Sequence, residues 1–276
     1  MIWANGRIWD EGEQPAVSLD DRVFVHGLGL FETMRTWEGR ALLLSRHRAR
    51  LMSSAVRLGI AVSPDALPDA EAVARLMAAE AIVGDCALRL TLTGGRSPSE
   101  PGLAWLKTMR LPPERRAGGL TLIFGGDVLH RGDPLAGHKT LNYWGRRMAH
   151  EQATALGADE ALLGTPDGKV WEGSRTNLFL VRGGKLVTPT LDGPILPGLM
   201  RGVVLERARA LGLTCEEREI GYGELDDADE LFLTNAVRGI QPVGCTPGRQ
   251  FPAPGPLTGR LDAELQGWLA SGGIDR

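Results

Sequence analysis

The sequence predicts a two-domain protein of mixed α/β structure, with a smaller N-terminal α/β domain over residues 1–117 and a larger, β-rich α/β domain over residues 118–276. Three observations support this prediction. A chain of 276 residues is long enough for two hydrophobic cores. Strand and helix patterns alternate in both halves, too irregularly for a doubly wound sheet. Residues 101–119 end in a Pro-, Gly- and Arg-rich stretch without periodicity, which we interpret as the linker.

The first domain is expected to contain two hairpins, two helices and a short β-rich run. Apolar and polar residues alternate around Asn5-Gly6, and a second strand pair turns at Glu38-Gly39. The two helices show apolar residues at helical spacing and end at glycines. In chain order these elements cover residues 2–10, 29–44, 45–60, 67–84 and 86–95.

The second domain is expected to begin with a strand over residues 120–126 and a helix over residues 139–157. Two hairpins follow, with Asp167-Gly168 and Gly183-Gly184 at their turns. The remaining expected elements are a helix, a strand with its turn, and a short final helix. They cover residues 198–212, 228–244 and 262–271.

Composition excludes several classes of protein. The net charge is −3 and the arginines are spread along the chain, so we expect no nucleic-acid or anionic-membrane partner. No apolar run approaches the ~20 residues that a membrane helix needs, and the first residues lack the features of a signal peptide. Three cysteines form no CxxC pair, so we expect no metal site and a reducing cytoplasm.

Lys139 is the first candidate for chemistry, because the chain has only four lysines against 27 arginines. It is predicted to open a helix, followed closely by Tyr143 and Trp144. A partly desolvated lysine loses its proton more readily and becomes a nucleophile, although most such lysines keep their charge in water. Glu172 lies in a segment that reads as buried, where a carboxylate needs a cationic partner. A protonated pyridine nitrogen is one such partner, and an exposed hairpin edge is the alternative.

These segments resemble the class IV aminotransferases, the fold-type IV enzymes that depend on pyridoxal 5′-phosphate. The resemblance rests on six fragments in order, from about Asn5 to Val243: NGRIW, FETMRTWEGR, the H-x-x-R-L of His47 to Leu51, HKTLNYWGRRMAHEQA with EGSRTNLFLV, LPGLMRG and FLTNAVRGIQPV. It implies a two-domain fold like that of D-amino-acid aminotransferase. It also implies an active site between the domains and a homodimer in which a neighbouring subunit completes each site.

The resemblance assigns cofactor roles residue by residue. Lys139 matches the covalent anchor of the cofactor, and Glu172 the carboxylate that keeps the pyridine nitrogen protonated. Arg50 matches the arginine that binds the phosphate, and the Leu199–Met200 turn matches the helix N-terminus that binds it with backbone N–H groups. Tyr143 is close to a tyrosine that some members direct at the cofactor. Many members have threonine where this chain has Met200 and Ala236, so phosphate binding here would depend on Arg50 and backbone donors.

The reaction is less clearly implied than the cofactor. Branched-chain aminotransferases usually have FEG where this chain has Phe31-Glu32-Thr33, and D-amino-acid aminotransferases usually have tyrosine at Phe31. The segments LTNAVRGIQPV and GLMR, with Thr33, resemble 4-amino-4-deoxychorismate lyases of folate biosynthesis, in which Thr33 would be catalytic. Thr33 is equally well explained as a β-branched strand residue.

Three arginines are candidates for binding a substrate carboxylate: Arg35, Arg96 and Arg238. Arg96 is equally well a solvated loop residue. The Gly/Arg-rich segment typical of the lyases keeps Gly94, Gly95 and Arg96 here but has lost its first arginine. We predict a lyase that forms p-aminobenzoate and pyruvate. The alternative is a transaminase of D-amino or branched-chain amino acids with a 2-oxo acid acceptor. A non-catalytic relative is the third reading, which the presence of Lys139, Glu172 and Arg50 together argues against.

Overall fold

The computed structural model describes residues 1–113, 117–126 and 128–273. The chain divides into two compact units. The smaller unit contains Met1–Pro112, with His138–Asn142 and residues 272–273. The larger unit contains Pro113–Gly137 and Tyr143–Ser271. Part of the predicted linker, residues 114–116, lies outside the described residues. Among the described residues, no helix is long and apolar enough to cross a membrane.

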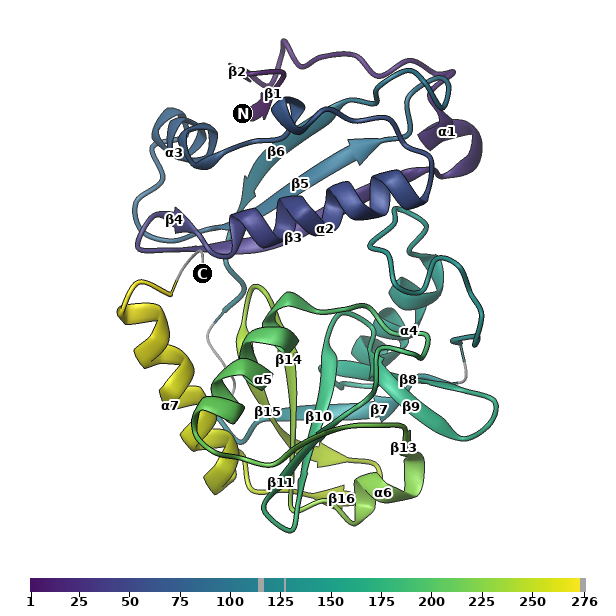
Figure 1. The fold of residues 1–276 in the computed structure, drawn as a ribbon, viewed down its shortest axis with the longest axis vertical. Coiled ribbons are helices and arrows are strands. Elements are labelled where there is room, and N and C mark those ends of the chain that lie inside the picture. The colour runs from purple at the N-terminus through teal and green to yellow at the C-terminus, as the bar shows by residue number, and fades with distance from the viewer. Residues whose placement is uncertain (114–116, 127, 274–276) are drawn as a thin grey trace. The chain divides into compact units, whose positions relative to one another are not determined.

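The smaller unit has a six-stranded sheet among its described residues, in the order β2-β1-β6-β5-β3-β4 (Figure 1). Its strands are β1 (Ile2–Ala4), β2 (Arg7–Trp9), β3 (Gly29–Trp37), β4 (Arg40–Ala41), β5 (Ala87–Thr93) and β6 (Ala104–Met109). Its helices are α1 (Arg22–His26), α2 (Leu44–Arg57), the 3-10 turn η1 (Pro64–Ala66) and α3 (Ala70–Ala79). The core lies between the sheet and helices α2 and α3, where Met34, Leu51, Leu76 and Leu90 are buried. Both predicted hairpins and both helices are confirmed.

The larger unit has a ten-stranded sheet among its described residues, in the order β12-β11-β10-β14-β15-β7-β8-β9-β13, with β16 beside β15. Its strands are β7 (Leu120–Phe124), β8 (Glu160–Thr165), β9 (Lys169–Gly173), β10 (Asn177–Arg182), β11 (Lys185–Thr188), β12 (Cys215–Glu217), β13 (Ile220–Gly221), β14 (Glu230–Asn235), β15 (Gly239–Thr246) and β16 (Arg249–Gln250). Its helices are α4 (Trp144–Ala155), α5 (Leu199–Ala210), α6 (Tyr222–Asp226) and α7 (Pro256–Ala270).

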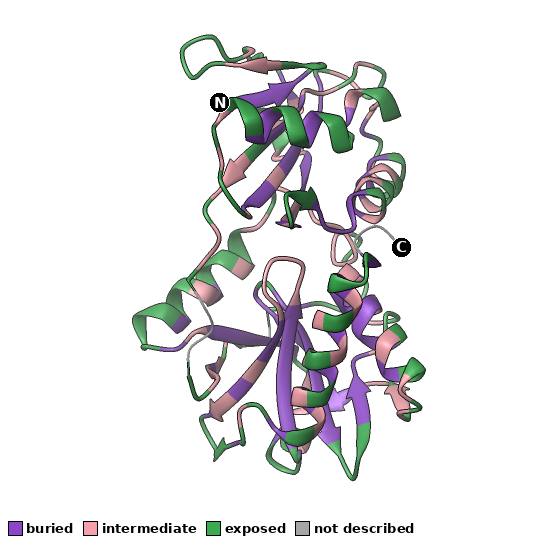
Figure 2. Ribbon diagram, turned by 90° about the vertical axis from the view of Figure 1, so that its left-hand side faces the viewer, coloured by how far each residue is buried: buried purple, intermediate pink, exposed green. Residues whose placement is uncertain are grey.

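The sheet of the larger unit closes on itself. Strands β9 and β10 pair at one position, Glu172 with Asn177, so that β10, β14, β15, β7, β8 and β9 form a ring. Figure 2 shows the strands of this unit buried along most of their length, while the helices carry exposed faces. Because the ring closes at Glu172, two buried polar side chains, Glu172 and Asn177, are brought together at this point.

Two expectations about helix ends are wrong. Lys139 does not open a helix, because α4 begins at Trp144. Instead, Thr140 pairs with Leu30 of β3 in an isolated antiparallel bridge, which supplies the backbone hydrogen bonds of this segment. The final helix is longer than predicted and begins at Pro256, where proline occupies the first turn. Strand β6, for which no element was predicted, is a central strand between β1 and β5.

Candidate active site

Lys139 is held in place through its backbone. Phe31 N donates to Lys139 O at 2.9 Å, and Leu141 N donates to Gly29 O at 2.9 Å. His138 adds a side-chain hydrogen bond to Ser54 of α2, at 2.9 Å between Nδ1 and Oγ. Gly29 allows this close pairing, because a Cβ there would lie only 2.5 Å from Leu141 Cδ1. The segment with Lys139 is therefore fixed against β3 as an added strand.

One face of β3 gathers several predicted residues around Lys139. Side chains alternate along a strand, so Phe31, Thr33 and Arg35 share one face, while Glu32 and Met34 are buried on the other. Lys139 Nζ lies 4.3 Å from the centroid of the Phe31 ring. We call the surface formed by Phe31, Thr33, Lys139 and Arg89 the Phe31 face.

Arg89 belongs to the Phe31 face but was not predicted as a site residue. Its Cζ lies 4.0 Å from the centroid of the Phe31 ring, and it stands opposite Thr33 in the β3–β5 register. The sequence reading of residues 86–95 as a β-rich run could have indicated Arg89 as a charge within an apolar strand. Its position beside Thr33 depends on the pairing of the two strands, which the sequence pattern does not give.

Arg50 is engaged by a buried carboxylate on the opposite face of β3. Glu32 accepts from Arg50 through both oxygens, at 2.8 Å from Nε and 2.6 Å from Nη2. His47 Nδ1 lies 2.7 Å from Glu32 Oε2, and both side chains are almost fully buried. Burial alone would raise the pKa of Glu32, but Arg50 and then His47 outweigh it and lower the pKa to about 2. Burial lowers the pKa of His47, so it is neutral at pH 7 and donates its Nδ1–H to Glu32.

Glu172 is a buried carboxylate in the larger unit, only 2% exposed, so it is not at an exposed hairpin edge. It accepts from Arg146 Nη2 in an ion pair. Leu196 N lies 3.3 Å from both of its oxygens, and Asn177 Nδ2 lies 3.4 Å from Oε2. Arg146 was not predicted, although its position on the helix after Lys139 is visible in the sequence.

Tyr143 is the N-cap residue of α4. Its hydroxyl donates to Ser174 O at 3.0 Å, which ties α4 to the turn that follows β9. Burial raises the pKa of the Tyr143 phenol, so this group stays protonated at neutral pH. Its predicted role near the cofactor remains a prediction.

The N-terminus of α5 combines close packing with backbone donors. Gly198, its N-cap residue, provides no side chain to cap the helix, and a Cβ there would lie 1.7 Å from Asn177 Oδ1. Leu199 and Met200 form the first turn, where backbone N–H groups lack partners within the helix and favour an anion. Ala236 lies in the turn between β14 and β15, in which Asn235 Oδ1 accepts from Val237 N and Arg238 N.

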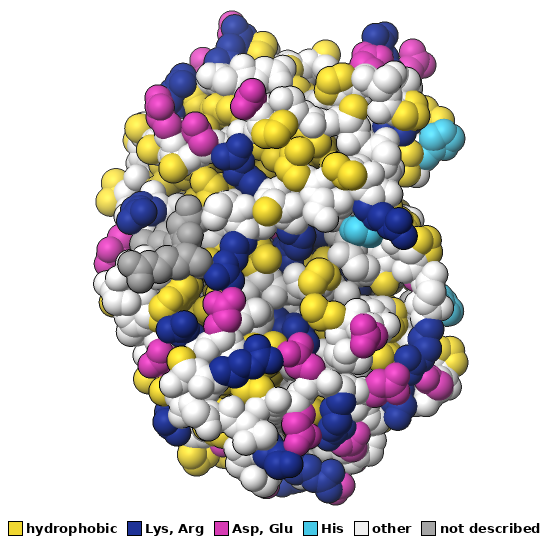
Figure 3. All heavy atoms as spheres, in the orientation of Figure 1, with side chains coloured by type: hydrophobic (Ala, Val, Ile, Leu, Met, Phe, Trp, Pro, Cys, Tyr) yellow, Lys and Arg dark blue, Asp and Glu magenta, His cyan; other side chains and the backbone are white. Residues whose placement is uncertain are grey.

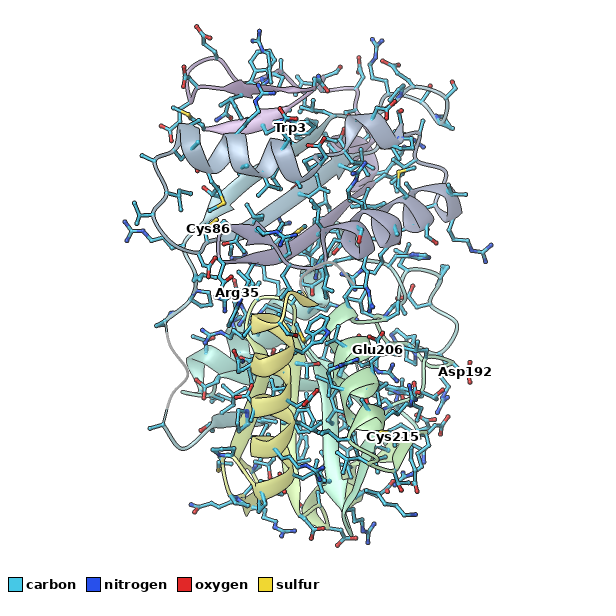
Figure 4. All side chains as sticks on the ribbon, turned by 60° about the vertical axis from the view of Figure 1, so that its left-hand side comes forward. Trp3, Arg35, Cys86, Asp192, Glu206 and Cys215 are labelled. Atoms are coloured by element: carbon cyan, nitrogen blue, oxygen red, sulfur yellow. The ribbon has the colours of Figure 1, made fainter. Side chains whose placement is uncertain are left out.

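The three predicted carboxylate-binding arginines are in different surroundings. Arg35 lies with Cys86 at one end of the smaller sheet (Figure 4), and its Nη2 is 3.7 Å from Asp85. Arg96 forms an exposed pair with Glu100, at 2.7 Å. Arg238 Nη1 donates to Pro113 O at 3.0 Å. Of the three, Arg35 lies on the same face of β3 as Phe31 and Thr33. The predicted role of all three arginines remains a prediction.

The donor set fits pyridoxal phosphate. The smaller unit provides the amine of Lys139 and the guanidinium of Arg50. The larger unit provides a buried carboxylate surrounded by donors, at Glu172, and a helix N-terminus without a side-chain cap, at α5. An amine for the aldehyde, a carboxylate for the ring nitrogen and cationic or N–H groups for the phosphate are the groups this cofactor needs.

Comparisons with known proteins agree on one family. The family described as amino-transferase class IV matches residues 29–244. A D-alanine aminotransferase from Bacillus licheniformis is 30% identical over 97% of this chain and 96% of its own. A bifunctional aminodeoxychorismate lyase / D-amino acid transaminase from Mycobacterium tuberculosis is 30% identical over 91% of this chain and 93% of its own.

A solved structure of the same kind supports the match. The crystal structure of 4-amino-4-deoxychorismate lyase from Pseudomonas aeruginosa has a TM-score of 0.82, at 32% identity, covering 97% of this chain and 98% of that chain. The family match covers well over half of the chain, and both the sequence relatives and the solved structure extend over nearly all of it. The chain therefore belongs to the class IV aminotransferases, and it is a pyridoxal-phosphate-dependent enzyme with their fold.

Proposed function

We propose that this enzyme is a 4-amino-4-deoxychorismate lyase, which forms p-aminobenzoate and releases pyruvate for folate biosynthesis. The observation that carries the proposal is the composition of the Phe31 face. It combines a lysine, a threonine hydroxyl and an arginine around one aromatic ring. The substrate carries two carboxylates and an amine, so a face with an arginine and a hydroxyl beside the lysine matches its charge and its chemistry.

The residues of this chain would have the following roles in the reaction. Lys139 takes the proton from the carbon that bears the substrate amine, and Thr33 or Lys139 gives a proton to the ether oxygen of the departing enolpyruvyl group. Breaking the C–O bond releases pyruvate and leaves the ring aromatic. The cofactor, when bound, supplies an electron sink for the pair released from the C–H bond. Arg89 binds a substrate carboxylate beside Thr33, in a bidentate manner suited to its planar fork.

The cofactor-binding roles complete this proposal. Glu172 holds the ring nitrogen, and Tyr143 lies near the ring. The phosphate is bound by Arg50 and by the backbone at Leu199, Met200 and Ala236. Arg35, Arg96 and Arg238 remain candidates for a second substrate carboxylate.

A transaminase is the second candidate. It is favoured by the high coverage of the D-alanine aminotransferase from Bacillus licheniformis and by the relative named for both activities. Lys139 and Glu172 serve proton removal in both reactions, so these residues do not distinguish them. Thr33 distinguishes them if it is the acid, because only the lyase must protonate a leaving oxygen.

Two parallel assays of the holoenzyme test the proposal. The first follows p-aminobenzoate and pyruvate formed from 4-amino-4-deoxychorismate. The second offers D-alanine or L-leucine with 2-oxoglutarate as acceptor. We expect p-aminobenzoate from the first assay, and its loss in Thr33→Val, which keeps the shape of the side chain but lacks the hydroxyl. Transamination without p-aminobenzoate would contradict the lyase and establish the alternative.

We also propose a cytoplasmic homodimer. On α4, Trp144 and Met148 are 70% and 61% exposed and lie four residues apart on one side of the helix. Such large apolar side chains on a helix surface favour burial against another molecule. Figure 3 shows acidic and basic side chains interspersed over the lower part of one face, and apolar side chains gathered in its upper part.

A further inference from the structure

Arg146 makes an ion pair that the proposed reaction does not use. It projects from α4, and its Nη2 donates to Glu172 Oε1. The two side chains are only 17% and 3% exposed. Burial alone would lower the pKa of Arg146, but the Glu172 carboxylate and then Tyr143 outweigh it and raise the pKa. The arginine is therefore charged and lies against the carboxylate with little screening by water.

The other described contacts of the Glu172 carboxylate are also with hydrogen-bond donors. Leu196 N and Asn177 Nδ2 both donate to it. Asn177 is itself fixed, because its Nδ2 also donates to Leu196 O at 3.0 Å. A further donor at this carboxylate, such as a ring N–H, would therefore compete with Arg146, Leu196 N and Asn177 for its oxygens.

We propose that Arg146 is a positioning residue that shares the Glu172 carboxylate with the ring nitrogen of bound pyridoxal phosphate and weakens the hydrogen bond between them. This inference rests on the proposed role of Glu172. The physical reason is competition between donors. An adjacent cation lowers the affinity of a carboxylate for a proton, so the ring N–H is held less strongly than it would be by Glu172 alone.

The test compares pyridoxal phosphate with its deaza analogue, in which a C–H group replaces the ring nitrogen. The ratio of their dissociation constants reports the bond to the ring nitrogen, and it can be measured by absorbance titration of the apoprotein without any turnover. A pH of about 8 is suitable, because burial lowers the pKa of nearby His150 and keeps it uncharged there.

Three variants make the comparison specific. Arg146→Gln removes the charge, and we expect the ratio to rise about fivefold, which is the effect of one strengthened charge-assisted hydrogen bond. Arg146→Lys keeps the charge, and the ratio should stay near that of the wild type. Arg147→Gln is the matched control, since Arg147 is the next residue of α4 but is 68% exposed and paired with Glu151. Its ratio should not change.

The outcomes separate this inference from the proposed role of Glu172. A ratio near one in the wild type would contradict the role of Glu172 and the inference with it. A ratio above one that stays unchanged or falls in Arg146→Gln would overturn the inference alone. If Arg146→Gln does not fold, the double variant Arg146→Gln/Glu172→Gln decides. Recovery of folding supports the pairing of the two charges, and failure to recover overturns it.

Discussion

Replacing Glu32 with glutamine would remove the only anion from the Glu32–His47–Arg50 network described above. The side chain of Glu32 is 1% exposed, and it accepts hydrogen bonds from Arg50 and His47 through both oxygens. Glutamine has nearly the same shape, so the perturbation is mainly electrostatic. Arg50, with a side chain that is 12% exposed, would lose an ionised partner while remaining largely buried.

The pKa of Glu32 gives the size of the effect. The difference between its ordinary value of 4.5 and about 2 in the folded protein, at about 1.4 kcal/mol per pH unit, is worth about 3 kcal/mol of stability. Loss of one partner from a buried ion pair typically costs about 3–5 kcal/mol, which agrees. Because the folded carboxyl has the lower pKa, this contribution is complete above pH 4.5 and is lost as the pH falls toward 2.

The assay is chemical denaturation of the apoprotein at pH 7 and at pH 3. Glu32→Gln is expected to lower the free energy of unfolding by about 3 kcal/mol at pH 7 and by clearly less at pH 3. Glu100→Gln is the control, since Glu100 and Arg96 also form a Glu–Arg pair of the smaller unit, but an exposed one. Removing this pair should lower the free energy of unfolding by less than about 1 kcal/mol. Equal losses in the two variants, or a loss in Glu32→Gln that does not depend on pH, would refute this account.

Three further predictions concern Lys139, Gly198 and Trp144. Lys139→Ala should lose the visible absorbance of the bound cofactor and all turnover. It should keep the circular dichroism of the fold, because the segment with Lys139 is held by backbone hydrogen bonds. Normal turnover would refute the role of Lys139. Gly198→Ala should lower the melting temperature by several degrees, because the added Cβ meets Asn177 Oδ1. Gly202→Ala at the same helix adds its Cβ in open space and should not lower it. Equal melting temperatures of the two variants would contradict this packing. Trp144→Glu places a charge on the exposed apolar side of α4 and should shift the molar mass in light scattering from that of a dimer toward the 29.7 kDa of one chain. An unchanged molar mass would contradict an interface at α4.

Local patterns predicted most of the secondary structure. Turn residues such as Asn5-Gly6 and Asp167-Gly168 separate short alternating runs, so the hairpins around them were predictable. The segment with Lys139 was misread because Leu141, Tyr143 and Trp144 continue the helical spacing of α4 backwards. Its true conformation is set by pairing with β3, over 100 residues earlier in the chain, and no local pattern contains that information.

In the candidate site, too, some residues could be predicted from local motifs and others depend on the packing of distant segments. Lys139, Glu172 and Arg50 were predicted as site residues because their short motifs resemble those of a known family. Arg89 and Arg146 were missed, since arginine is frequent in this chain and neither lies in a distinctive motif. Their places beside Phe31 and Glu172 depend on strand register and on the packing of α4.

The sequence by itself determined the family, the cofactor and the alternation of strands and helices, because these follow from short motifs and from periodicity. The tertiary structure decided which charges meet. It closed the larger sheet at the Glu172–Asn177 pair, placed Arg146 against Glu172, and buried Glu32 with His47 and Arg50. The physical reason is that the free energy of a charge depends on its burial and on its partners, and both are fixed only when distant segments pack.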